Sequence, residues 1–198
     1  MTGLRIGLLG GSFNPAHEGH LHLSLIALSR LRLDQVWWLV SPQNPLKPEA
    51  GMAPFEDRIA GAGAVARHPR IRVSDIETKF GTRYTVDTLR ELRQRFTRHR
   101  FVWVMGADNL IQLPRWRHWT AIFELAPVAV FARPTYSGRA LSGAAAQRFR
   151  RYRLPDRAAA RLASAKPPAW VFLHTPLHPA SATAIRAARL KAPQEEPM

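Results

Sequence analysis

The sequence predicts an α/β fold in which an open, mainly parallel β-sheet carries helices on both faces. Short apolar runs alternate along the chain with segments whose apolar residues have helical spacing. Because parallel strands need a crossover, and a helix is the usual one, this alternation favours a doubly wound sheet with right-handed connections. Turn residues gather behind several of the apolar runs, as they do where strands end in loops.

The first strand and helix are the clearest elements. Leu4–Leu9 is an apolar run closed by glycines and predicts a buried strand, and leucines at helical spacing predict a helix over Gly19–Leu31. The run VWWLV, Val36–Val40, predicts a second strand. The proline-rich stretch Ser41–Pro54 predicts a loop after it.

The middle of the chain continues this alternation. Phe55–Arg67 predicts a helix with a proline next to its first turn. Ile71–Ile76 alternates apolar and polar residues and predicts a third strand. After a turn at Gly81, the amphipathic pattern of Thr85–Phe96 predicts another helix.

The last part of the chain supplies three more strands and a helix. The strands are expected at Phe101–Met105, Val128–Ala132 and Trp170–Leu173, and the helix at Ser181–Leu190. We expect a single domain over residues 1–190 and a disordered tail over residues 191–198.

Composition limits the class of protein. The chain has 198 residues, of which 46% are hydrophobic, enough for a packed core. It has no apolar run long enough to span a membrane and no signal-peptide pattern, so we expect a cytoplasmic protein with no membrane partner. Cysteine is absent, which excludes disulfides and thiolate metal sites.

The net charge of +15 favours anionic partners. Arg139–Lys166 holds eight basic residues against one acid and predicts one or two surface helices with a solvated face. A nucleic-acid-binding surface is the alternative for this segment. Nucleic acid is not the expected partner, because the segment has few aromatic residues that could stack on bases.

Three unusual loops follow predicted strands. GGSFNPAHEGH follows the first strand, SPQNPLK the second and GADN the fourth. The carboxyl ends of parallel strands share one edge of the sheet, and ligands bind at that edge where the strand order reverses. The sequence therefore predicts the site at this edge.

The first loop has features of a phosphate site. Gly10 and Gly11 let the backbone come close to a ligand, so that its N–H groups can meet phosphate. His17 and His20 stand at the start of a predicted helix, whose positive N-terminal end attracts anions, and both imidazoles can donate hydrogen bonds. Zinc is the alternative for an H-x-x-H pair, but no third ligand is evident, so no metal-ligating residue is predicted.

Other candidate residues have structural alternatives. Asp108, just past the fourth strand, can accept hydrogen bonds from ribose hydroxyls or can cap the following helix. Ser181 and Thr183 can cap the last helix, whose free N–H groups and Arg186 could also face an anion.

These residues resemble the motifs of a known family. GGSFNPAHEGH resembles the loop of the nucleotidyltransferases with an H-x-G-H motif, which have a Rossmann-like fold. The blocks SPQNPLK, RYTVDTL, GADNLIQLPRW, FARP and SATAIR extend the resemblance, in order and from Gly10 to Arg186, to bacterial nicotinate-nucleotide adenylyltransferases.

The resemblance implies a transferase of NAD biosynthesis that moves the adenylyl group of ATP to nicotinate mononucleotide and releases deamido-NAD and pyrophosphate. It implies Mg²⁺ as a cofactor, bound mainly through the ATP phosphates. The implied catalytic residues are His17, His20, Lys47 and Arg186. The implied ATP-binding residues are Gly10, Gly11, Ser12, Phe13, Gly106, Asp108, Arg133, Ser181 and Thr183. The implied nicotinate mononucleotide-binding residues are Asn14, Lys47, Tyr84, Thr85 and Trp116.

The chain departs from the family pattern at four positions. Asn14 and Ser12 replace the usual Asp and Thr, Leu46 stands where His is common, and Ala182 where Ser is common. These departures affect contacts to phosphate and leave both histidines in place. The alternatives are an adenylyltransferase for nicotinamide mononucleotide or phosphopantetheine, and a basic nucleic-acid-binding module.

Overall fold

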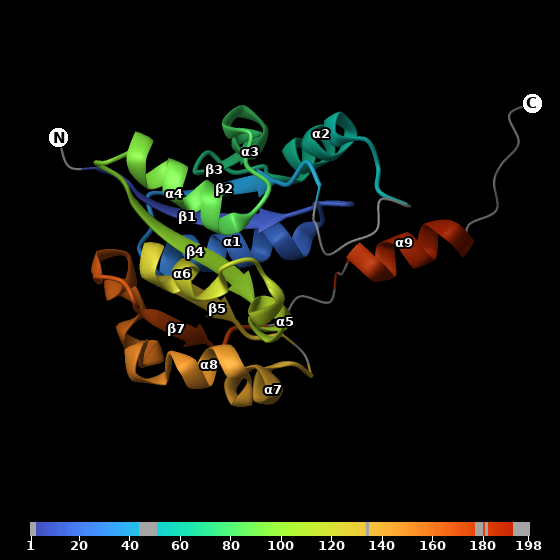
Figure 1. The fold of residues 1–198 in the computed structure, drawn as a ribbon. Coiled ribbons are helices and arrows are strands. Elements are labelled where there is room, and N and C mark those ends of the chain that lie inside the picture. The colour runs from blue at the N-terminus through green and yellow to red at the C-terminus, as the bar shows by residue number, and fades with distance from the viewer. Residues whose placement is uncertain (1–2, 44–50, 134, 177–179, 181, 192–198) are drawn as a thin grey trace, which may run out of the picture.

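The computed structural model describes residues 3–43, 51–133, 135–176, 180 and 182–191. Seven strands form one sheet in the order β3-β2-β1-β4-β5-β7-β6, and every neighbouring pair is parallel (Figure 1). The strands are β1 Arg5–Gly11, β2 Gln35–Val40, β3 Ile71–Ser74, β4 Arg100–Gly106, β5 Val128–Phe131, β6 Arg153–Leu154 and β7 Trp170–Leu173. The predicted open parallel sheet is confirmed.

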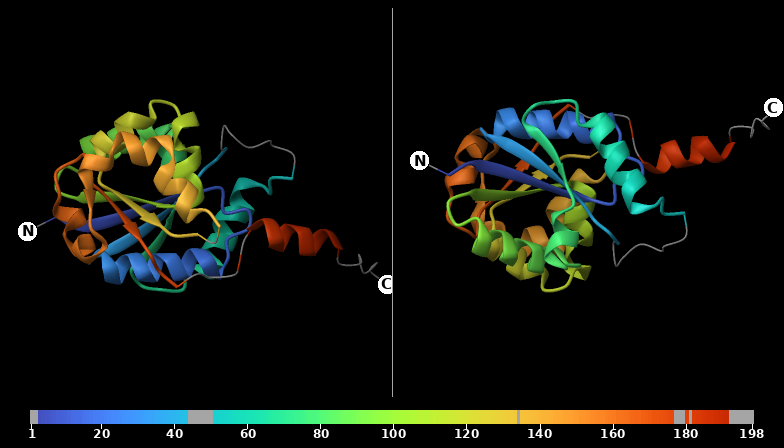
Figure 2. Two further views of the ribbon diagram at one scale, coloured as in Figure 1. Left: turned by 90° about the horizontal axis from the view of Figure 1, so that it is seen from below. Right: turned by 90° about the horizontal axis from the view of Figure 1, so that it is seen from above.

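Helices cover both faces of the sheet, as predicted. One face packs against α3, α4, α5, α6 and α8, and the other against α1, α2 and the 3₁₀ helix η3 (Figure 2). The helices are α1 Glu18–Arg30, α2 Phe55–Val65, α3 Ile76–Phe80, α4 Thr85–Arg95, α5 Ala107–Gln112, η1 Leu113–Arg115, α6 Trp119–Leu125, α7 Ser137–Ser142, α8 Ala144–Arg148, η2 Arg150–Tyr152, η3 Asp156–Ser164 and α9 Ala182–Lys191. Within the described ranges, no helix combines the length and apolar character needed to cross a membrane.

The central strands are buried on both sides, which explains their continuous apolar runs. In β4, Phe101, Trp103 and Met105 pack on one face of the sheet, whereas Val102 and Val104 pack on the other. Residues with a period of two therefore feed two separate cores. The sheet, packed on both faces, holds the ends of the loops at its edge in fixed positions.

The strand order reverses between β1 and β4. From β1 the chain moves outward through β2 to β3, then returns to place β4 on the opposite side of β1. The loops that leave the carboxyl ends of β1 and β4 consequently diverge over opposite faces and leave a crevice between them. The α9 helix extends away from this loop side of the sheet (Figure 2).

Two predictions about elements were wrong. The strand expected at Ile71–Ile76 ends at Ser74, and Ile76 begins α3, which ends at Gly81 in the left-handed conformation. Thr78 N and Lys79 N donate to the Asp75 carbonyl oxygen at 3.0 and 3.2 Å, so the chain turns into a helix here instead of continuing the strand.

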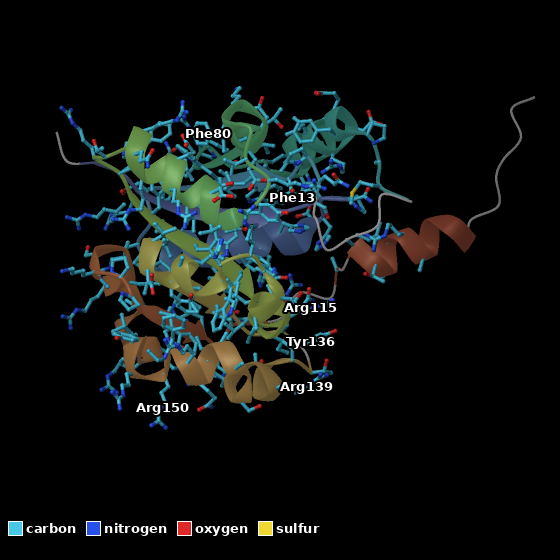
Figure 3. All side chains as sticks on the ribbon, in the orientation of Figure 1. Phe13, Phe80, Arg115, Tyr136, Arg139 and Arg150 are labelled. Atoms are coloured by element: carbon cyan, nitrogen blue, oxygen red, sulfur yellow. The ribbon has the colours of Figure 1, made fainter. Side chains whose placement is uncertain are left out.

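The basic segment Arg139–Lys166 is also more broken than one or two surface helices. Gly143 and Pro155 interrupt it, and it forms parts of α7, all of α8, η2 and η3, and the edge strand β6. Five of its alanines are buried, as are Phe149 and Leu162, while Arg139 and Arg150 point away from the sheet (Figure 3). The final helix runs to Lys191 rather than Leu190, and residues 192–198 of the expected tail lie outside the described residues.

A buried arginine ties the loops after β1 and β2 together. Arg58 of α2 is 4% exposed, and its guanidinium donates to the carbonyl oxygens of Ser12 at 2.8 Å and Ser41 at 2.7 Å. It also donates to Pro42 at 2.9 Å and Ala53 at 3.0 Å. Burial lowers the pKa of Arg58 from its usual value, but an arginine remains charged at neutral pH.

We expect Arg58→Met to destabilise the protein by about 3 kcal/mol, because carbonyls that are withheld from water lose a charged donor. The measurement is the free energy of unfolding in urea. Arg67→Met is the matched control, since the Arg67 side chain forms an exposed ion pair with Glu18 and its loss should change stability by less than about 0.5 kcal/mol. Equal losses in the two variants would contradict the assignment.

Candidate active site

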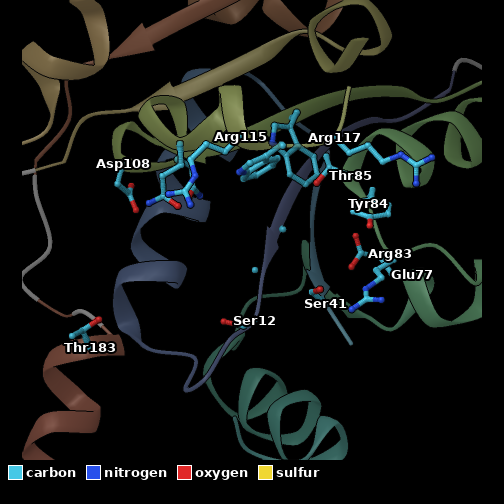
Figure 4. Close-up of a pocket in the computed structure, with 16 residues that line it drawn as sticks. Ser12, Ser41, Glu77, Arg83, Tyr84, Thr85, Asp108, Arg115, Arg117 and Thr183 are labelled. Atoms are coloured by element: carbon cyan, nitrogen blue, oxygen red, sulfur yellow. The ribbon is translucent and has the colours of Figure 1, made fainter. Parts of the chain in front are cut away.

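A cavity of about 380 Å³ lies at the carboxyl edge of the sheet, at the reversal of strand order (Figure 4). It is formed by the end of β1 and its loop, Ser41 after β2, α3, the start of α4, β4, the helices that follow β4, and α9. Its lining consists of Gly10, Gly11, Ser12, Ser41, Glu77, Arg83, Tyr84, Thr85, Trp103, Asp108, Asn109, Gln112, Arg115, Trp116, Arg117 and Thr183.

A second cavity, of about 520 Å³, lies at the opposite edge, near the amino ends of β4, β5 and β7. Although it is larger, none of the residues predicted for the site lines it. In parallel sheets the ligand binds at the carboxyl edge, so the smaller cavity is the candidate active site.

The two histidines of the first loop are organised by the backbone of α1. His17 is the N-cap, and its Nδ1 accepts from Gly19 N at 3.1 Å, while Nδ1 of His20 accepts from His17 N at 3.2 Å. A neutral imidazole whose Nδ1 accepts carries its proton on Nε2. Both rings therefore present Nε2–H donors, and their centroids are only 4.0 Å apart.

Gly19 is required between these histidines. A Cβ at this position would lie 2.9 Å from atoms of the His17 ring and 3.2 Å from the Ala180 carbonyl oxygen. The glycine thus lets the His17 ring fold back over the first turn of α1. The capping interaction and the spacing H-x-G-H have the same geometric origin.

Phe13 fixes the position of the first loop. Its φ of 46° lies in the left-handed region, which is unusual for a residue other than glycine. Its ring is 2% exposed, stacks on Trp38 with centroids 5.2 Å apart, and lies 4.8 Å from the His20 ring. Packing maintains the strained backbone here and supports His20 from one side.

Asn14 and Arg186 connect this loop to other segments. The Asn14 side chain donates to Gly51 O at 2.9 Å and accepts from Ala53 N at 3.3 Å. Arg186 of α9 donates to Asn14 O at 2.5 Å and reaches Thr183 Oγ1 at 3.4 Å. Asn14 thus belongs to the first loop, called the histidine loop below because it contains His17 and His20, and Arg186 contacts it. Neither Asn14 nor Arg186 lines the cavity.

Asp108 and Arg133 meet over Gly106 at the end of β4. The Asp108 carboxylate and the Arg133 guanidinium form an ion pair at 3.5 Å. A Cβ on Gly106 would lie 2.4 Å from Asp108 Oδ1 and 2.8 Å from Arg133 Nε, so any larger residue would displace these two side chains from their present positions. Those same two atoms are buried and have no hydrogen-bond partner in the part of the chain that the structure describes, which is typical of a site that awaits a ligand.

The opposite wall of the cavity is aromatic. Trp103 and Trp116 meet edge to face with centroids 6.5 Å apart, and both indole N–H groups lack a partner among the described residues. Tyr84 is the N-cap of α4 but makes no side-chain cap, so the N–H groups of the first turn at Thr85 are left for other acceptors. Arg117 lies 4.8 Å from the centre of the Tyr84 ring.

Glu77 of α3 was not foreseen from the sequence, yet its side chain lines the cavity and is 6% exposed. Burial raises the pKa of this carboxyl to about 7, although hydrogen bonds from the Thr88 and Ser41 hydroxyls lower it. Thr88 Oγ1 lies 3.2 Å from Glu77 Oε1. The short segment ETKF offered no motif that would have revealed this acid.

The structure brings many of the predicted site residues to one cavity. Among them, Gly10, Gly11, Ser12, Tyr84, Thr85, Asp108, Trp116 and Thr183 line it. The adjoining first loop contains Phe13, Asn14, His17 and His20 and is contacted by Arg186, whereas Gly106 and Arg133 lie beside Asp108 at the end of β4. Lys47 and Ser181 lie outside the described residues. Sequence reasoning missed Ser41, Glu77, Arg83, Trp103, Asn109, Gln112, Arg115 and Arg117 as lining residues, although the arginines flanking Trp116 were visible beside a quoted motif.

The fold and the histidine loop define the class, a nucleotidyltransferase. A family model described as cytidylyltransferase-like matches residues 8–188. A protein of Parvibaculum lavamentivorans called probable nicotinate-nucleotide adenylyltransferase is 56% identical to this chain, over 93% of this chain and 92% of its own length. A protein of the same name from a Caulobacter species is 52% identical to this chain, over 95% of this chain and 100% of its own length. The chain therefore belongs to the cytidylyltransferase-like family, and within it to the bacterial nicotinate-nucleotide adenylyltransferases.

A solved structure supports the fold independently of close sequence similarity. The nicotinic acid mononucleotide adenylyltransferase of Plasmodium falciparum, complexed with NaAD, matches with a TM-score of 0.69 at 14% identity. The match covers 92% of this chain and 82% of that one. At this identity the likeness establishes the shared architecture.

The two roles of His17, capping α1 and presenting Nε2–H, should separate by mutation. We expect His17→Ala to lower both activity and stability, the latter by about 1 kcal/mol, because the N-cap is lost. His17→Asn keeps an N-cap acceptor and should recover most of the stability but not the activity. Thermal unfolding and steady-state turnover measured on both variants test this, and recovery of activity in His17→Asn would show that His17 acts only as a cap.

Proposed function

We propose that this enzyme catalyses the transfer of the adenylyl group of ATP to nicotinate mononucleotide, giving deamido-NAD and pyrophosphate in NAD biosynthesis. One observation carries the proposal: the histidine loop at the end of β1 adjoins a cavity whose far wall holds Trp116 and the uncapped start of α4. A phosphate-binding edge and an aromatic, anion-accepting edge thus share one space. A single nucleotidyltransferase domain over residues 1–190 would contain both.

The ATP side would be formed by the first loop and the end of β4. The Nε2–H groups of His17 and His20 would donate to phosphate oxygens, with His20 at the α-phosphate, and the N-terminal end of α1 would add a positive dipole. Asp108 would accept from ribose hydroxyls. Gly106 and Arg133 would lie next to the nucleoside.

The transfer is one displacement at phosphorus. A phosphate oxygen of nicotinate mononucleotide forms a bond to the α-phosphorus, and the bond from that phosphorus to the pyrophosphate oxygen breaks with its electron pair. The protein needs to align these groups and stabilise the charge, since the reaction requires no covalent enzyme intermediate. Lys47, Ser181, Thr183 and Arg186 are proposed to face the leaving pyrophosphate.

The pyridine end of the acceptor would bind at the aromatic wall. Trp116 would stack on the ring, and the backbone N–H groups at Tyr84 and Thr85 would receive its carboxylate. Asn14 is proposed to act near the acceptor phosphate, and in the structure its side chain holds the segment around Ala53 in place.

We propose that ATP enters as its magnesium complex. The cation would be coordinated by phosphate oxygens and water. Bound in this way, the ion would neutralise phosphate charge. The cytoplasm, where ATP is abundant, is the proposed compartment.

The direct test measures pyrophosphate release from ATP with nicotinate mononucleotide, its amide and phosphopantetheine in parallel, at one salt concentration. We expect kcat/KM to favour the acid over the amide by about 100-fold or more, because the amide NH₂ meets N–H donors without a lone pair to offer them. Equal values for acid and amide would remove the assignment of the carboxylate to α4. Salt-sensitive DNA binding without turnover would favour the nucleic-acid alternative.

Trp116→Ala should raise the KM for nicotinate mononucleotide about fivefold or more and leave the KM for ATP nearly unchanged, since stacking contributes on the order of 1 kcal/mol. Trp119→Ala is the control, because Trp119 packs against Phe149 in the core and does not line the cavity. The control should lower the melting temperature without a substrate-specific effect. The same kinetic result for both variants would make Trp116 a core residue only.

A further inference from the structure

Glu77 is an acidic residue of the cavity in which we propose that nicotinate mononucleotide binds, and the pyridine ring of this acceptor carries a carboxylate of its own. It lines the cavity on the same wall as Arg83, Tyr84 and Ser41 (Figure 4). The hydrogen bonds that the described residues give it come from the hydroxyls of Thr88 and Ser41, and it belongs to no ion pair among them. Among the described residues no cation pairs with the Glu77 carboxyl, although Arg83 lines the same wall, so a charged Glu77 would repel an anion brought close to it.

The charged groups around Glu77 are engaged elsewhere. On its own helix, Lys79 pairs with Asp75 at 2.9 Å, and on α4 Arg90 pairs with Asp87 at 2.9 Å. The Arg83 guanidinium, in the loop between them, donates to Gln43 at 2.9 Å.

Across the cavity the lining adds two more cations and one more acid, Arg115, Arg117 and Asp108. With Glu77 neutral, three arginines face a single carboxylate. The ionisation of Glu77 would remove part of this positive excess at the wall that α4 completes.

We propose that Glu77 is a specificity-determining residue whose proton controls the affinity for the acceptor: the cavity binds the pyridine carboxylate when Glu77 is neutral and disfavours it when Glu77 is ionised. This inference rests on the proposed function. Above neutral pH, binding of the acceptor would then draw one proton from solvent onto the Glu77 carboxyl.

The sign of the pH dependence follows from the pKa of Glu77. Its value in the free protein is about 7, raised by burial, and a second carboxylate in the cavity would raise it further. Below pH 7 the acid is already neutral and binding costs no proton. Above pH 7 the affinity should fall by up to tenfold for each pH unit, until the pKa of the complex is passed.

The test compares the wild-type enzyme with Glu77→Gln, which keeps the shape and a carbonyl acceptor but has no charge. We measure KM and kcat at saturating ATP between pH 6 and 9, with nicotinate mononucleotide and with its amide. Both acceptors carry the same phosphate, so its ionisation cancels in their ratio. For the wild type, the KM ratio of acid to amide should rise about tenfold between pH 7 and 8.5. For Glu77→Gln the ratio should stay flat over the same range.

A second variant covers the case in which Glu77→Gln does not fold. Thr88 is fully buried and does not line the cavity, and its hydroxyl stabilises the charged form of Glu77. Thr88→Val should therefore shift the rise in the KM ratio to higher pH. An identical pH profile in the wild type and in either variant overturns the proposal. If the wild-type enzyme releases no pyrophosphate with either mononucleotide, the proposed function is overturned. If it turns over normally but its KM ratio of acid to amide does not change with pH, only the role of Glu77 is overturned.

Discussion

The active edge of this protein depends on one buried cation. Arg58 reaches from α2 beneath the sheet edge and bonds to carbonyl oxygens on the loops after β1 and β2 and before its own helix. Ser41 shows how closely the site is coupled to it: its N–H donates to Gly11 O, its carbonyl accepts from Arg58, and its hydroxyl donates to Glu77. A buried charge that donates to four backbone carbonyls tolerates little movement of those carbonyls. The loops that carry the chemistry are thereby held at fixed positions although neither is part of the sheet.

Hydrogen bonds to backbone groups also position the two histidines of the first loop. Nδ1 of each ring accepts from an N–H at the start of α1, and this fixes the tautomer that carries its proton on Nε2, the donor that we propose for phosphate. The helix dipole points in the same direction. The helix cap, the histidine tautomers and the orientation of the helix dipole thus all follow from the first turn of α1. The H-x-G-H spacing is the sequence pattern that produces this turn.

The fold and the cavity at the carboxyl edge of the sheet could be predicted because their signals are local. Apolar runs mark β1, β2, β4, β5 and β7, and the loop motifs lie directly behind three of them. The strand β6 was missed because two residues, Arg153 and Leu154, carry no period, and α3 because Ile71–Ile76 reads as one alternating run. Arg58 and Glu77 were missed for another reason: their roles come from partners far along the chain, Ser12 and Ser41 for the arginine and Ser41 and Thr88 for the acid. No spacing within a helix reveals which loop a side chain will meet.

The crevice itself is produced by the absence of side chains at the ends of β1 and β4. A Cβ on Gly10 would lie 2.5 Å from the Trp103 ring, so glycine on β1 is what allows an indole from the neighbouring strand to form the cavity wall. At Gly106 the missing Cβ leaves room for Asp108 and Arg133 to meet over the strand end. Both glycines lie beside the reversal of strand order, where diverging loops already open the sheet edge. The reversal of strand order therefore opens the crevice. The two glycines leave room in it for side chains from other positions, so that aromatic and charged groups from different strands share one small space.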